Sequence, residues 1–151
     1  MEFDYLELKH ATHHLYIKLL EPILKEYDLT RMEVGILLFL ANNPQVDTAS
    51  QMVNLRRLTK SHVSSAVARL ADLGYLERFY EGCNQKTVHL RLQQAAYPIV
   101  TAGKACQQQF RDFLMQGISE EEKEQLIFLL EKVKANTKDA FEVLDREEGG
   151  Q

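Results

Sequence analysis

The stretch from Leu58 to Arg78, LTKSHVSSAVARLADLGYLER, carries hydroxyl, imidazole and cationic side chains at the spacing of a helix face. Its apolar residues recur every three or four positions, which predicts an amphipathic helix over about residues 59–73. The opposite face lacks the long Glu, Lys and Gln side chains that usually cover an exposed helix. It carries short or weakly helix-forming residues instead, namely Ser61, His62, Ser64, Ser65 and Ala68. We therefore expect this face to lie against another surface.

A nucleic acid is a suitable partner for such a face. The major groove of DNA admits an α-helix when no long side chain holds the helix away. Cations neutralise phosphates, and hydroxyl or imidazole groups hydrogen-bond phosphates or base edges. The candidate residues are Arg56, Arg57, Lys60, Ser61, His62, Ser64, Ser65 and Arg69. The alternative is an ordinary solvated helix, which the basic neighbours and the pattern that follows disfavour.

Charge is distributed unevenly along the 151 residues, whose formal net charge is −4. Residues 56–104 hold 8 Lys and Arg against 3 Asp and Glu, whereas residues 1–55 and 105–151 are both acidic. The unusual helix therefore lies in the one basic part of an acidic chain, as expected for a nucleic-acid contact.

The remaining pattern predicts a mainly α fold with one small hairpin. Thr30 and Ser119, each followed three residues later by Glu, are capping-box signatures for helix starts. Pro22 should kink or break the first helix, and Gly74 should end the unusual one. The expected helices span residues 3–27, 30–42, 48–54, 94–116 and 119–145, and the expected strands are LERFYE and TVHLRL, joined by Gly82–Gln85.

Composition fits one soluble domain with a sizeable core, because 45% of the residues are hydrophobic and 26% are charged. No apolar stretch is long enough to cross a bilayer and the N-terminus does not resemble a signal peptide, so we expect a cytoplasmic protein without membrane contact. The two cysteines have no CxxC spacing and are expected to be free thiols.

Two short helices, the second with small polar residues outward and followed by a basic hairpin, form the pattern of a winged helix-turn-helix. Three features carry a resemblance to a known family: the motif Leu29-Thr30-x-x-Glu33, the segment TKSHVSSAVARLADLGYLER, and an alternating strand that leads into a long helix. Through them the chain resembles the MarR family of bacterial transcription regulators over nearly its whole length. The resemblance implies a single domain over residues 1–151. Residues 30–93 would form its winged-helix DNA-binding core, and residues 3–27 and 95–145 its N- and C-terminal dimerisation helices.

The same resemblance implies a homodimeric repressor that binds a pseudo-palindromic operator in double-stranded DNA. It also implies that a small aromatic effector releases the protein from the DNA. It also adds Thr59 to the recognition helix. The chain departs from the family pattern at the wing, where Asn84-Gln85-Lys86 replaces the usual Asp-x-Arg sequence. Asn84 is expected to hydrogen-bond Arg78 in support of the wing, and Lys86 is the nearest cation for a minor-groove contact.

The apolar positions of residues 3–27 cover more than half of that helix, so two packing partners are expected: the chain's own core and a second subunit. The segment 119–145 keeps near-heptad apolar spacing and should contribute to the same dimer. An effector is expected between the first helix and the winged core, where Tyr5, His13, Tyr16 and Ile17 would line a mostly apolar pocket.

Other chemistry is weakly indicated. His10, His13 and His14 have a spacing that can bring two imidazoles to one metal, but packing or interface roles are favoured, and no metal or cofactor is expected. Cys83 on the wing is a less favoured candidate redox sensor, and Cys106 is expected to be packed. No catalytic motif is present, so an enzyme is not expected. The main alternative to a DNA-binding regulator is a winged-helix adaptor that binds protein and holds DNA weakly, which the neutral wing and acidic net charge favour.

Overall fold

The computed structural model describes residues 3–56 and 58–148, apart from the side chains of residues 55, 56, 147 and 148. The chain divides into two compact units, Met1–Arg111 and Asp112–Gln151. The first unit contains the helices α1 (Tyr5–Tyr27), α2 (Arg31–Asn42), α3 (Ala49–Arg56) and α4 (Lys60–Asp72), then the strands β1 (Leu76–Phe79) and β2 (His89–Leu92), the 3-10 turn η1 (Gln94–Ala96) and most of α5 (Tyr97–Leu114). The second contains α6 (Glu120–Glu148). The predicted fold class, mainly α with a two-stranded wing, is confirmed.

The helix starts follow from local hydrogen bonds. Thr30 and Glu33 form the predicted capping box at the start of α2, with hydrogen bonds of 3.2 and 2.7 Å. Ser119 and Glu122 form the same arrangement before α6. Thr48 accepts from the Gln51 N–H before α3. These caps satisfy N–H groups that the first helical turn leaves without a partner.

The first helix continues through Pro22, so the break that the sequence allowed does not occur. Proline has no N–H, so one carbonyl group of the preceding turn lacks its usual helical partner. Pro22 lies on the exposed side of α1, where water can hydrogen-bond that carbonyl group instead. The helix ends at Asp28, whose φ of 49° places it in the left-handed region.

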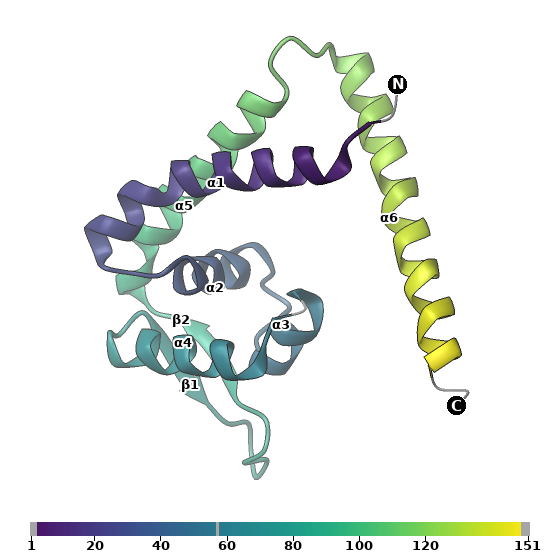
Figure 1. Cartoon of the computed structure of the whole chain (residues 1–151). Coiled ribbons are helices and arrows are strands. Elements are labelled where there is room, and N and C mark those ends of the chain that lie inside the picture. Colours follow the sequence, from purple (N-terminus) through teal and green to yellow (C-terminus); the bar gives the residue numbers. More distant parts are fainter. Residues whose placement is uncertain (1–2, 57, 149–151) are drawn as a thin grey trace. The chain divides into compact units, whose positions relative to one another are not determined.

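A layer of apolar side chains holds the winged core together. Figure 1 shows α2 between α1 and α4, with the β1–β2 hairpin extending beyond α4. Val34, Leu37, Val63 and Leu70 are fully buried. Ile99 joins them from α5, and at Gly103 an added Cβ would lie 2.6 Å from a methyl carbon of Leu38. A side chain at position 103 would therefore have to displace the Leu38 side chain where α5 approaches α2.

The wing is a short antiparallel hairpin. Leu76 pairs with Leu92 and Phe79 with His89, so the strands are shorter than the six-residue segments expected from alternation. Leu76 and Leu90 turn into the core while Glu77 and Arg91 face outward. Gly74, with φ of 79°, takes the left-handed conformation expected at the end of the preceding helix.

Candidate nucleic-acid interface

The α4 helix has one buried and one exposed face, as its sequence predicts. Val63, Ala66, Val67 and Leu70 are buried against α2, α3 and the wing. The opposite face is exposed and consists of Ser61, His62, Ser64 and Ser65. No side chain longer than His62 stands on this face between Lys60 and Arg69, so the helix can approach a groove closely.

Thr59 and Lys60 stand at the start of α4 and are both exposed. Thr59 is the N-cap, but its side chain makes no capping hydrogen bond. The first N–H groups of a helix carry a partial positive charge and attract phosphates. The Thr59 hydroxyl, these N–H groups and the Lys60 ammonium together form a suitable contact for the DNA backbone.

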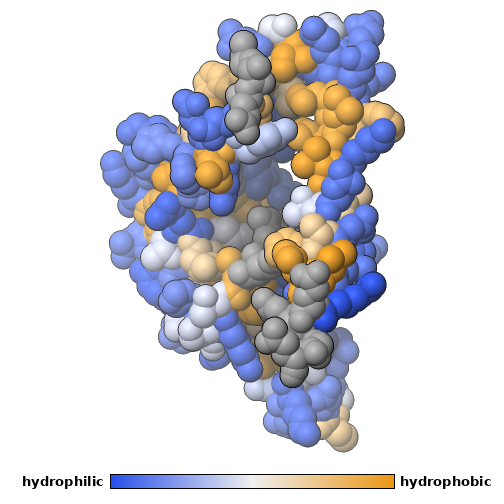
Figure 2. All heavy atoms as spheres, turned by 45° about the vertical axis from the view of Figure 1, so that its right-hand side comes forward, coloured by the Kyte–Doolittle hydropathy of each residue, from blue (hydrophilic) through white to orange (hydrophobic). Residues whose placement is uncertain are grey.

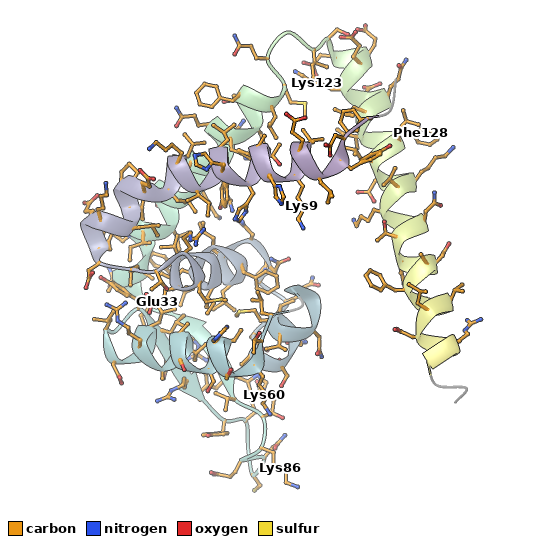
Figure 3. The ribbon with its side chains drawn as sticks, viewed as in Figure 1. Lys9, Glu33, Lys60, Lys86, Lys123 and Phe128 are labelled. Atoms are coloured by element: carbon orange, nitrogen blue, oxygen red, sulfur yellow. The ribbon has the colours of Figure 1, made fainter. Side chains whose placement is uncertain are left out.

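A groove of about 400 Å³ separates α3 and α4 from the wing. Its cations are Lys60 of α4, Arg78 of β1 and Lys86 of the wing, and no described carboxylate lines it. Figure 3 shows Lys60 and Lys86 toward the wing end of the winged core. The remaining lining residues are Ala49, Ser50, Val53, Asn54, Val63, Ser64, Val67 and Val88. A cationic groove with polar edges suits one phosphate strand.

Sequence reasoning gives Arg78 only a supporting role and misses Ser50 and Asn54. Arg78 is expected from the sequence to hydrogen-bond Asn84, yet it lines the groove. Ser50 and Asn54 lie on α3, where the sequence shows no unusual composition; only the packing of α3 beside α4 brings them to the groove.

Asn84 stabilises the wing turn itself, which corrects the expected bond to Arg78. Its amide nitrogen donates to Thr87 Oγ1 at 3.3 Å, and its carbonyl oxygen accepts from the Lys86 N–H at 3.0 Å. An Asn side chain that bonds the backbone two residues ahead is a common device of tight turns. Asn84 therefore shapes the segment that presents Lys86.

Arg69 has a structural role that the sequence does not indicate. Its guanidinium donates to Glu33 Oε2 at 2.7 Å and to the Asp28 carbonyl oxygen at 2.9 Å. The Glu33 side chain is only 4% exposed, and Figure 3 labels it near the start of α2. Arg69 therefore joins α4 to the end of α1 and the start of α2, and we assign it to this clamp rather than to a phosphate.

This clamp predicts a pH-dependent contribution to stability. Burial disfavours charged Glu33, but hydrogen bonds from the Thr30 backbone and from Arg69 outweigh burial and hold the pKa of Glu33 below its usual value. A carboxylate with a lowered folded pKa stabilises the fold at neutral pH, and this contribution is lost as the pH falls through that pKa. We expect Glu33→Ala to cost about 1–3 kcal/mol of unfolding free energy at neutral pH, and the deficit to shrink in acid.

Denaturant unfolding over a pH series measures this effect. Arg69→Ala should lower stability in the same pH range, because it removes the partner of Glu33. Glu26→Ala removes an exposed carboxylate of α1 and serves as the control. A pH-independent deficit in Glu33→Ala would contradict the assigned role of its charge.

Two of the predicted DNA-binding side chains cannot be placed. Arg57 lies outside the described residues, and Arg56 ends α3 but its side chain is likewise outside them. Both therefore stay sequence-based predictions.

A second cavity, of about 550 Å³, lies between α1 and the winged core. Three of the four residues expected in the effector pocket line it: His13, Tyr16 and Ile17. Tyr5 does not line it and is 70% exposed near the start of α1. The cavity's other lining residues are Leu20, Arg31, Met32, Gly35, Ile36, Phe39, Met52 and Leu58. His13, Tyr16 and Arg31 are the lining residues with polar side-chain groups, and the rest of the lining is apolar.

The other chemical candidates are placed as follows. His10, His13 and His14 are exposed on α1 and form no metal-binding group of three with other described ligands. Cys83 is exposed on the wing. Cys106 donates to the Leu19 carbonyl oxygen at 3.2 Å, and burial raises the pKa of its thiol. The predicted packing role of Cys106 agrees with this geometry.

Comparison with known proteins supports the winged helix-turn-helix interpretation. A sequence model of the MarR family matches residues 27–80, which extend from the end of α1 into the wing. No curated protein matches the chain. Among the described helices, none combines the length and the apolar character that crossing a bilayer requires.

Solved structures share the fold over almost the whole chain. A Listeria monocytogenes protein described as a MarR family transcriptional regulator, crystallised with 26mer DNA, is 19% identical, with a TM-score of 0.79 over 92% of this chain and 91% of that one. The transcriptional regulator SlyA is 20% identical, with a TM-score of 0.79 over 94% and 99%. The S. aureus MepR–DNA complex is 22% identical, with a TM-score of 0.74 over 90% and 99%.

At these identities the structural likeness establishes the fold, and the family model adds the sequence of the helix-turn-helix itself. The chain therefore has a winged helix-turn-helix fold, and its residues 27–80 match the sequence model of the MarR family.

Proposed function

We propose that the chain is a DNA-binding transcription regulator, a repressor that holds a pseudo-palindromic operator as a homodimer and is released by a small effector. The observation that carries the DNA-binding part is the exposed, short-chained face of α4 beside a groove lined by Lys60, Arg78 and Lys86. In this arrangement α4 enters the major groove, with Ser61, His62, Ser64 and Ser65 toward the bases. The wing follows the neighbouring backbone.

Two related structures support this proposal, because the Listeria monocytogenes and S. aureus proteins were solved with DNA. The Listeria monocytogenes protein and SlyA are described as transcriptional regulators, so the proposed role includes no catalytic activity. A dimer also fits the proposal, since two recognition helices can occupy two successive major grooves on one side of the duplex.

Unpaired apolar surface supports the dimer. On α6, large side chains that are half exposed or more include Ile127, Phe128, Leu129, Leu130, Val133, Val143 and Leu144. Phe3, Tyr5, Leu6 and Leu8 are similarly exposed at the start of α1. Figure 2 shows hydrophobic side chains at the surface in neighbouring groups rather than singly. A long helix exposing so many apolar groups needs a partner, and a second copy is the partner we propose.

The two lysines give the direct test of the DNA interface. We expect Lys60→Ala to weaken binding to operator and unrelated DNA alike. The slope of log affinity against log salt should fall by about one for each phosphate that the variant leaves unneutralised in each half-site. Specificity should survive, because phosphate contacts carry no sequence information. Lys86→Ala should have a smaller effect, because one flexible ammonium replaces the arginine usual at this wing.

Competition gel shifts at several salt concentrations measure both effects. Lys25→Ala removes the same charge from the last turn of α1 and serves as the control. If Lys86→Ala proved the most damaging and Lys60→Ala harmless, α4 would not be the main DNA contact.

The adaptor hypothesis keeps some support from the neutral Asn84-Gln85 wing tip and from the net charge of −4. It differs from the regulator hypothesis in one measurable way. An adaptor should show similar weak affinity for every duplex, whereas a regulator should prefer its operator by about 10³-fold or more.

The effector part of the proposal rests on the cavity between α1 and the winged core. Its apolar lining and its size suit a small aromatic molecule, with His13 and Arg31 as polar contacts. A ligand there would act by favouring one arrangement of α1 against the core, and so one spacing of the two recognition helices.

We expect Gly35→Leu to fill this cavity and abolish effector release without loss of DNA binding. Gly35 lies within α2, lines the cavity, and has no atom near the position of an added Cβ. Replacing glycine in a helix should also favour folding, by up to about 1 kcal/mol. The effect is measured by titrating aromatic acids into operator complexes of the wild type and of Gly35→Leu. Equal release of both by the same compound would place the effector elsewhere.

A further inference from the structure

Three side chains that the DNA interface does not use converge at the base of the wing. His89 Nδ1 lies 3.0 Å from Asp47 Oδ2, and His89 Nε2 lies 3.8 Å from Glu81 Oε2. One candidate ligand atom from each of the three residues lies within 4.8 Å of those from the other two. Asp47 precedes Glu81 by more than thirty residues, so no short sequence motif reveals the cluster.

The fold holds two of these residues in place before any ligand arrives. The Leu90 N–H donates to the Asp47 carbonyl oxygen, and a β-bridge joins Thr48 to His89. The His89 ring stacks on Phe79, with 5.3 Å between ring centroids, and its side chain is only 15% exposed. Glu81 follows β1 and its side chain is 68% exposed, so it can move toward the other two.

The chemistry of the set suits a transition metal. Each ring nitrogen of His89 faces a carboxylate oxygen. In either neutral tautomer, one ring nitrogen therefore has a free lone pair next to an anionic oxygen, which is a pair of groups that can bind one metal ion. Imidazole and carboxylate are both common zinc ligands, at about 2 Å from the ion. Small side-chain movements would bring three atoms within 4.8 Å of one another to that distance.

Charge favours a cation as well. Among the described residues, the ion pairs of Asp47 and Glu81 are with His89, and neither carboxylate is paired with Lys or Arg. With a neutral imidazole the cluster carries two negative charges on segments that also border the DNA groove. A divalent cation would neutralise both.

We propose that the base of the wing is a Zn²⁺ site, with one ring nitrogen of His89 and the carboxylates of Asp47 and Glu81 as protein ligands and water completing the coordination. The ion would tie the wing, through Glu81, to the segment that precedes α3. It would thereby fix the width of the groove between wing and α4, a consequence that rests on the proposed DNA-binding function.

The test begins with the full chain, freed of metal and without DNA. Zn²⁺ is titrated in competition with a chromophoric chelator, and Co²⁺ is titrated separately to detect nitrogen ligation by its visible absorption. We expect one site per chain, lost in His89→Ala and weakened at least tenfold in Asp47→Asn and Glu81→Gln. Because Glu81 is largely exposed, Glu81→Gln tests the site even if His89→Ala fails to fold.

The matched control is the double variant His10→Ala/His14→Ala, which removes imidazoles from α1 and should keep the site intact. Loss of the site in this control, or unchanged affinity in Glu81→Gln and Asp47→Asn, would overturn the proposal. Binding of Mg²⁺ or Ca²⁺ as tight as that of Zn²⁺ would also overturn it, because such binding needs no imidazole.

The effect on the wing is measured separately. Zn²⁺ should strengthen DNA binding by the wild type several-fold and leave Glu81→Gln unchanged. Equal affinity with and without bound Zn²⁺ would overturn the role in the wing. If no DNA were bound under any condition, the proposed function would fail, while the titration without DNA would still decide the metal site.

Discussion

Ser61→Glu and Ser65→Glu are each expected to abolish specific DNA binding while leaving the fold intact. Both serines lie on the exposed face of α4, so a longer side chain meets no core residue. If this face enters the major groove, the new carboxylate lies against phosphates and base edges. The helix is also held further from the groove floor. We expect a loss of about 2 kcal/mol or more per half-site.

Fluorescence anisotropy with labelled operator measures the loss, and circular dichroism checks the fold. Ser61→Ala removes the hydroxyl without adding length or charge, so it should retain most of the affinity. Strong binding by both Glu variants would show that α4 lies outside the groove, and the protein-binding adaptor would become the better hypothesis.

Removal of residues 119–151 is expected to abolish the soluble dimer. This segment contains all of α6, whose large side chains include Leu130 at 53% exposure and Val133 at 50%. In a dimer these groups would be covered, and the folding of each chain would depend on the other. A well-folded monomer in ultracentrifugation after this truncation would contradict the prediction.

Point variants separate loss of the dimer from loss of the helix. Leu130→Asp and Val133→Asp place a charge on the apolar side of α6 and should raise the dimer dissociation constant by about 100-fold or more. Ala135 lies on the opposite side of the helix, since successive residues turn by about 100°. Ala135→Asp should therefore leave the dimer intact, and equal damage by all three would indicate a general loss of helix stability.

Local signals predicted the elements of the fold. The Thr30–Glu33 and Ser119–Glu122 pairs marked two helix starts correctly, because a capping box involves only residues three positions apart. The apolar periodicity of α4 likewise indicated its buried face. Pro22 does not break α1; its effect depends on whether the freed carbonyl group faces water, which depends on tertiary structure.

The candidate site was less predictable where side chains have distant partners. Arg69 has the type and position of a phosphate contact, and only the fold brings Glu33 and Asp28 to its guanidinium. His89 and Asp47 likewise meet only through the pairing of β2 with the segment before α3. Exposure of the serines could be predicted because helical periodicity alone determines it.

The clamp around Arg69 also affects the entropy of recognition. A helix that becomes ordered only on DNA loses conformational freedom at that moment, and this loss reduces the net affinity. Here one guanidinium ties α4 to both α1 and α2 in the free chain. The recognition helix is therefore preorganised, and its encounter with the major groove should resemble the docking of a rigid body rather than coupled folding and binding.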